Sequence, residues 1–145
     1  MSVESESVRA TAQLVEGVAA WYRRRAVRLC VLFGSRARGG ARRESDLDVA
    51  LWVDSPPPAA HLLVWRRELT RDAGVPVQLV LVTPSLDPVL GFEIARDGEP
   101  LYQADPGSWS QERMRLWHAY QDALPFLRAS RRRLGEFVAR VRRGA

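Results

Sequence analysis

Apolar and polar residues follow one another along the chain in blocks that predict alternating strands and helices. The run at 27–33 is apolar enough for a buried strand. The same patterns predict helices over about 8–25, 59–73 and 86–96, strands over 46–53 and 75–82, an edge strand over 100–103, and a last helix from about Ser108. Gly98 is expected to cap the helix before it, and Pro125 to break or kink the last helix. The expected fold class is α/β (α+β), a small mixed β-sheet backed by helices, with a C-terminal helical segment.

The chain has enough residues for one hydrophobic core. It has 145 residues, of which 46% are hydrophobic and 27% charged. We expect residues 1–106 to form the core and residues 107–145 a C-terminal helical extension of the same domain. No apolar run is long enough to cross a bilayer and the acidic start is unlike a signal peptide, so we expect a cytoplasmic protein with no membrane partner. Cys30 lies in the first predicted strand, which favours a small buried residue over a nucleophile.

A predicted strand-to-helix turn follows the first strand. Gly34 ends that strand, and Ser35 stands where a helix can begin. The serine hydroxyl and the first free amides of such a helix can bind a triphosphate. Arg36 and Arg38 add positive charge beside the turn. We therefore expect Gly34, Ser35, Arg36 and Arg38 to bind the phosphates of a nucleotide.

Two aspartates one residue apart follow this turn. Alternation along the second predicted strand places Asp46 and Asp48 on one face. Two carboxylates this close repel each other unless a cation lies between them. Mg²⁺ prefers carboxylate and phosphate oxygens, and two such ions about 4 Å apart activate an attacking hydroxyl and stabilise a leaving pyrophosphate. We expect Asp46 and Asp48 to be metal ligands and catalytic residues; the alternative is a polar hairpin loop with solvated charges.

The arrangement of Gly34 and Ser35, ten further residues, then Asp46 and Asp48, resembles the motif of the DNA polymerase beta nucleotidyltransferase superfamily. The resemblance is strongest to its short bacterial and archaeal minimal nucleotidyltransferases, and residues 94–102 resemble a later family segment. It implies a nucleotidyltransferase fold and Mg²⁺-dependent transfer of NMP, with AMP from ATP as the expected donor, onto a protein hydroxyl. It also implies a small helical HEPN protein as partner, in a toxin–antitoxin pair.

One position departs from the family pattern. The resemblance implies a third catalytic aspartate on the next core strand, where this chain has Gln78. A glutamine amide carries no negative charge and cannot accept a proton from a hydroxyl at neutral pH. Asp72 and Asp87 flank that strand but would require the chain to bend back. Two hypotheses stay open: an enzyme working with two acids, or a catalytically weakened antitoxin that acts by binding its partner.

A third hypothesis is transfer to a small molecule of the aminoglycoside type, which the lack of residues for an acceptor domain argues against.

The net charge is +5, with arginine as the only basic residue apart from two histidines. The basic tail at 128–143 has an apolar stripe, consisting of Leu134, Phe137, Val138 and Val141, that could dock on this domain's sheet, a second copy or another protein. Nucleic acid is not expected, because no aromatic residues interleave the arginines. A homo-oligomer stays open, and His61 and His118 are expected to be ordinary helix residues.

Overall fold

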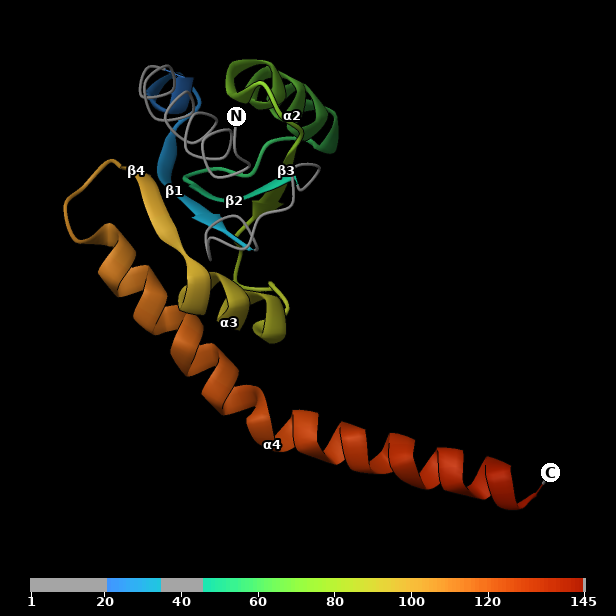
Figure 1. The fold of residues 1–145 in the computed structure, drawn as a ribbon. Coiled ribbons are helices and arrows are strands. Elements are labelled where there is room, and N and C mark those ends of the chain that lie inside the picture. The colour runs from blue at the N-terminus through green and yellow to red at the C-terminus, as the bar shows by residue number, and fades with distance from the viewer. Residues whose placement is uncertain (1–20, 35–45, 145) are drawn as a thin grey trace, which may run out of the picture.

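The computed structural model describes residues 21–34 and 46–144. Its elements are β1 (Val27–Phe33), β2 (Leu47–Val53), α2 (Ala59–Ala73), β3 (Val77–Leu81), α3 (Pro88–Asp97), β4 (Glu99–Gln103) and α4 (Ser108–Arg143), shown in Figure 1. Residues 21–24 are also helical, where the sequence predicts the end of an opening helix; the rest of that prediction falls outside the described residues. The predicted fold class, a mixed sheet with helices and a C-terminal helix, is confirmed.

The sheet has the strand order β3-β2-β1-β4. Strand β1 runs antiparallel to both β2 and β4, whereas β2 and β3 are parallel. A parallel pair needs a crossover connection, and α2 provides it. The two central strands are buried along nearly their whole length, as their apolar sequences require.

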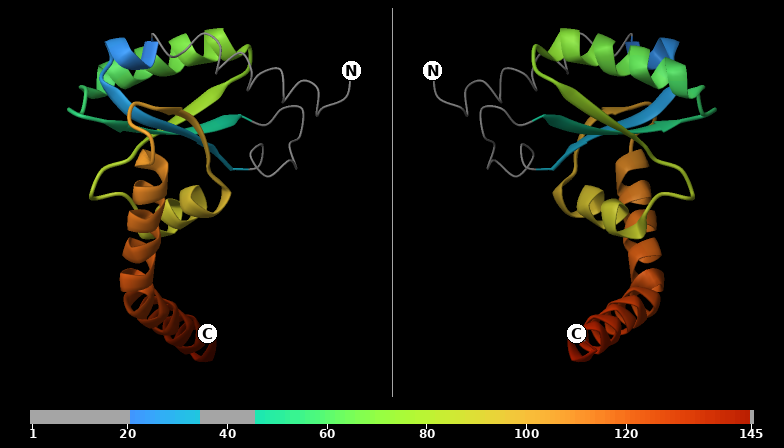
Figure 2. Two further views of the ribbon diagram at one scale, coloured as in Figure 1. Left: turned by 90° about the vertical axis from the view of Figure 1, so that its left-hand side faces the viewer. Right: turned by 90° about the vertical axis from the view of Figure 1, so that its right-hand side faces the viewer.

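Helices cover both faces of the sheet (Figure 2). Helix α2 and the helical turn at 21–24 lie on one face, while α3 and the first half of α4 lie on the other. Alternate residues of the strands supply the two cores: Val49 and Leu51 belong to the α2 side, and Ala50 and Trp52 to the α3 and α4 side. Odd-numbered residues of β2 therefore face α2, and even-numbered residues face α3 and α4.

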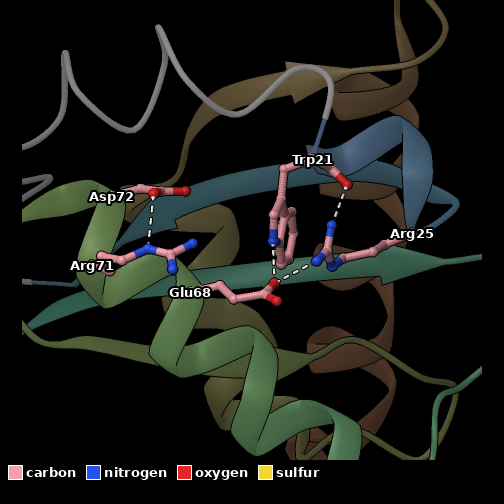
Figure 3. A network of polar contacts seen from close by, with 5 residues as sticks. All are labelled: Trp21, Arg25, Glu68, Arg71 and Asp72. Atoms are coloured by element: carbon pink, nitrogen blue, oxygen red, sulfur yellow. Dashed lines mark hydrogen bonds and ion pairs between the residues drawn. The ribbon is translucent and has the colours of Figure 1, made fainter.

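A half-buried carboxylate joins the opening helix to α2 (Figure 3). Glu68 Oε2 accepts a hydrogen bond from Trp21 Nε1 at 2.6 Å and another from Arg25 Nη2 at 2.6 Å. The Arg25 guanidinium also lies 4.5 Å from the centre of the Trp21 ring. One acid thus satisfies an indole and a guanidinium, which fixes α2 over its face of the sheet.

Cys30 has the structural role that the sequence predicts. It is fully buried in β1, and its thiol donates to the Tyr22 hydroxyl at 3.0 Å. Burial raises the pKa of the Cys30 thiol to about 12. The thiol therefore stays protonated at neutral pH, as an unreactive core residue does.

Several predicted boundaries shift by a few residues. Helix α3 begins at Pro88 because Asp87 caps it, its Oδ1 accepting from Val89 N at 3.0 Å. Gly98 occupies the C-cap position of α3, as predicted, but its backbone is extended (φ −68°) rather than left-handed. Close packing explains why this residue is glycine. A Cβ at position 98 would collide with the Ile94 carbonyl and lie 2.7 Å from Trp109 Cζ2.

Of the break or kink predicted at Pro125, the break does not occur, because α4 is one helix of 36 residues that includes Pro125. The helix bends partway along instead (Figure 1). Its first half packs on the domain through Trp109 and Leu116, whereas Met114 and Trp117 are exposed. Its second half extends away from the sheet. No helix in the described parts of the chain is long and apolar enough to span a membrane.

Candidate active site

The two motif aspartates and Gln78 meet where β2 and β3 begin. Asp46 directly precedes β2, and Asp48 lies within it, opposite Phe33 of β1 and Gln78 of β3. The Gln78 side-chain amide donates to Asp46 Oδ2 at 2.8 Å. Alternation places Asp48 and Gln78 on the face that α3 covers, because their neighbours Ala50 and Val80 pack there. We call Asp46 and Asp48 the acid pair. The structure thus brings the acid pair together with Gln78, which stands where the family pattern has a third aspartate.

Gly34 lies against the second aspartate. Its φ is +81°, a left-handed conformation that glycine adopts without strain. A Cβ built on Gly34 would collide with Asp48 Oδ2. The absent side chain therefore leaves room for the carboxylate, and this contact links the glycine half of the motif to the aspartate half.

Negative charge is concentrated at Asp48. Burial raises the pKa of its carboxyl, and the charges of Asp46 and Glu93 raise it further. A cation at this point would relieve the repulsion, and carboxylate oxygens are ligands that Mg²⁺ prefers. The donor set of Asp46 and Asp48 therefore fits a magnesium ion. Among the residues described, no group of three histidine, cysteine or acidic side chains could hold a metal, and the third side chain at this point is Gln78 rather than an acid.

Glu93 is an acid of this region that sequence reasoning missed. It lies on α3, is exposed, and acts on the Asp48 carboxyl through its charge. The two alternatives considered from the sequence do not join the site. Asp87 caps α3, and Asp72 lies on α2, on the other face of the sheet, 3.8 Å from Arg71. The sequence has no motif that distinguishes Glu93 from any other single glutamate on a helix. Its place near Asp48 could be predicted only by knowing that α3 packs on this face of the sheet.

The remaining predicted residues have simpler outcomes. Ser35, Arg36 and Arg38 lie outside the described residues, so their contact with phosphate stays a prediction. His61 and His118 are exposed helix residues. The arrangement that the structure does describe, a glycine turn facing a carboxylate pair at the end of a mixed sheet, is the type of site that nucleotidyltransferases use.

Comparison with protein families agrees with this class. The model of the family described as polymerase beta, nucleotidyltransferase, matches residues 18–107, which include Gly34, both aspartates and Gln78. The match covers more than half of the chain. The chain belongs to the polymerase beta nucleotidyltransferase family.

Solved structures share the fold over nearly the whole chain. A chain of a toxin–antitoxin complex with AMP-PNP matches with a TM-score of 0.68 and 21% identity, covering 89% of this chain and 98% of that chain. A chain of the tri-AMPylated Shewanella oneidensis HEPN toxin in complex with MNT antitoxin matches with a TM-score of 0.59 and 17% identity, covering 95% and 99%. A chain of the MntA-HepT toxin–antitoxin matches with a TM-score of 0.59 and 18% identity, covering 92% and 97%. No curated protein matches the chain.

Proposed function

We propose that this protein is a Mg²⁺-dependent nucleotidyltransferase that moves AMP from ATP to a hydroxyl group of a HEPN partner protein, as the antitoxin of a toxin–antitoxin pair. One observation carries the proposal: Asp48 lies against Gly34 and is close enough to Asp46 to feel its charge, in a chain of the nucleotidyltransferase family. The structurally similar proteins support the choice of partner and nucleotide. They include a toxin–antitoxin complex with AMP-PNP and a complex containing an AMPylated HEPN toxin.

The residues divide the work as follows. Asp46 and Asp48 would hold Mg²⁺, which when bound activates the attacking hydroxyl and neutralises the leaving pyrophosphate. Gly34 lets the backbone approach the acid pair, and Ser35, Arg36 and Arg38 are proposed to bind the triphosphate. Gln78 holds one oxygen of Asp46 through its amide, which makes it a positioning residue rather than a proton acceptor.

Gln78 also favours a second candidate function, in a different class. The side chain at the third position carries no charge, so the site lacks an acid that the family pattern provides. In this alternative the protein is an antitoxin that neutralises its partner by binding alone. A stable complex that tolerates Asp46→Asn supports this alternative, whereas a complex lost on that substitution excludes it.

The deciding experiment is a calorimetric titration of the protein with ATP, with and without Mg²⁺. The double variant Asp46→Asn/Asp48→Asn removes the metal ligands. Asp54→Asn is the matched control, because Asp54 follows the far end of β2 and forms an exposed ion pair with Arg28 at 3.1 Å. Binding that requires Mg²⁺ and the two site aspartates, but not Asp54, supports the enzyme. No ATP binding by the unmodified protein excludes it.

Transfer itself is tested with labelled ATP and a purified HEPN protein. We expect label on the HEPN protein with the unmodified chain and with Asp54→Asn, and none with the double variant. Label that still appears with the double variant would remove the two-aspartate mechanism.

A further inference from the structure

One stripe of side chains runs along the whole of α4 with a heptad spacing. Its members alternate at intervals of three and four residues after a first interval of seven, the pattern of a coiled-coil seam. We call this stripe the α4 seam; it consists of Trp109, Leu116, Tyr120, Ala123, Leu127, Ser130, Leu134, Phe137 and Val141.

The two halves of the seam differ in what covers them. Trp109 and Leu116 are each 8% exposed and pack in the core with α3 and the sheet, and Tyr120 stacks on Phe92 of α3 at a ring distance of 4.3 Å. From residue 131 to residue 143 every position is exposed. We call these residues the arm. Leu134, Phe137 and Val141 are 63%, 57% and 55% exposed, so the described chain leaves most of the seam uncovered there.

A groove marks the point where the covered half gives way to the arm. It has a volume of about 520 Å³ and is lined by Val89 of α3 and by Leu127, Arg131 and Leu134 of α4, among others. Val89 is 40% exposed and apolar. A helix lying along the arm would reach apolar side chains of the domain at this end.

The arm also concentrates the positive charge of the protein. It holds six arginines and one glutamate, a net charge of +5, equal to that of the whole chain. At 100° per residue, Arg131 lies on one side of the seam, and Arg133 and Arg140 lie on the other. In coiled coils the residues beside the seam select the partner by charge. Two copies of the arm side by side would place like charges together, which disfavours self-pairing.

We propose that the arm is a docking site for a helix of a partner protein that carries its own apolar seam flanked by acidic side chains. The arm offers 13 helical residues, about 20 Å of helix. The partner helix covers Leu134, Phe137 and Val141, and its acidic side chains pair with the arginines beside them. The identity of the partner as a HEPN protein rests on the proposed function, but the chemistry of the surface does not.

The test uses the full-length protein and a pair of labelled synthetic helical peptides. Both peptides carry leucine at seam positions over about 20 residues; one carries glutamate at the flanking positions and the other lysine. We expect fluorescence anisotropy to show binding of the glutamate peptide at least tenfold tighter than that of the lysine peptide. Leu134→Ser/Phe137→Ser should weaken the glutamate peptide at least tenfold without affecting the fold, because both side chains are exposed.

Charge reversal separates docking from a general loss of structure. The variant Arg131→Glu/Arg133→Glu/Arg140→Glu should invert the preference and bind the lysine peptide, which a misfolded arm would not do. Arg132→Glu/Arg143→Glu is the matched control, since both residues lie on the back of the helix relative to the seam. We expect this control to change binding of the glutamate peptide less than threefold at about 0.15 M salt, where a Debye length of about 8 Å screens charges on the back of the helix.

Other occupants give other outcomes. The proposal is overturned if the protein prefers vesicles of phosphatidylcholine and phosphatidylserine or poly(A) RNA to the glutamate peptide, or if it sediments as a dimer that Leu134→Ser/Phe137→Ser dissociates. Failure to distinguish the two peptides also overturns it. The ATP titration is independent, because the seam variant keeps Asp46 and Asp48. Peptide binding without ATP binding removes the proposed function alone, and the reverse removes the docking site alone.

Discussion

The acid pair and the arm each gather one sign of charge, but the fold treats them differently. At the acid pair, strand register and the close backbone of Gly34 fix the carboxylates, and burial raises the pKa of Asp48. In the arm, seven charged side chains stand on an exposed helix whose described residues have no neighbour from the sheet. The difference indicates two kinds of ligand. A rigid, partly buried pair suits a small cation, whereas an exposed seam of about 20 Å suits another helix.

The substitution Asp48→Asn tests the acid pair most severely. It keeps the shape of the side chain but removes a charge that the proposed ion needs. Because a bound metal is worth several kcal/mol to a transition state, we expect AMP transfer to fall about a thousandfold. The measurement is the initial rate of label transfer at saturating ATP and Mg²⁺. A loss below tenfold would mean that the acid pair does not hold the metal, while peptide binding to the arm should be unchanged either way.

Gln78→Asp tests whether the third position limits the rate. It adds a carboxylate beside Asp46 and removes the amide that now donates to Asp46 Oδ2. With Mg²⁺ present the added charge becomes a ligand and a proton acceptor, so we expect a rate increase of about tenfold, or about 1.4 kcal/mol. The control is Gln78→Leu, which removes the amide without adding a charge and should slow transfer. A slower Gln78→Asp variant would show that the hydrogen bond to Asp46 matters more than a third acid.

The raised pKa of Asp48 gives the acid pair a pH dependence. Between the usual aspartate pKa and the raised value, the folded state binds more protons than the unfolded state. Stability of the metal-free protein should therefore fall as pH rises through this window. Protons also compete with Mg²⁺, so the affinity for Mg²⁺ should fall as pH decreases through the same window.

Thermal melting from pH 4 to pH 7, with and without Mg²⁺, measures both effects. The shift caused by Mg²⁺ should grow with pH in the unmodified protein and vanish in Asp48→Asn, which has no carboxyl to titrate. A shift that is equal at all pH values in the unmodified protein would place the ion away from Asp48.

The sequence predicts the elements around the site well, because their signals are local. The bounds of β1 and α2 follow directly from apolar patterns and from the glycines that end them: Gly34 after β1, and Gly74, which caps α2 in a left-handed conformation. The bond between Gln78 and Asp46 could not be predicted in the same way, since it depends on the register between two parallel strands. Glu93 reaches the site only because α3 folds back over the even-numbered face of β2. Side-chain partners across elements depend on topology, which periodicity does not encode.

The same distinction applies to α4. The sequence predicts its start near Ser108 and an apolar stripe that docks on something, with the domain's own sheet as one option. The exposure of Leu134, Phe137 and Val141 excludes that option. The apolar stripe itself does not change along α4. The seam loses its neighbours where α4 bends and extends beyond the rest of the domain.

Gly135→Ala tests the arm with the smallest expected effect. Gly135 lies within α4, and an added Cβ would meet nothing within 4 Å. Alanine favours an exposed helix interior over glycine by about 1 kcal/mol, so we expect higher helicity by circular dichroism and glutamate-peptide binding up to about fivefold tighter. ATP binding at the acid pair should not change. Unchanged peptide affinity despite higher helicity would mean that binding does not depend on the helical form of the arm, which contradicts helix docking. Weaker binding would place Gly135 inside the contact and contradict the position of the seam.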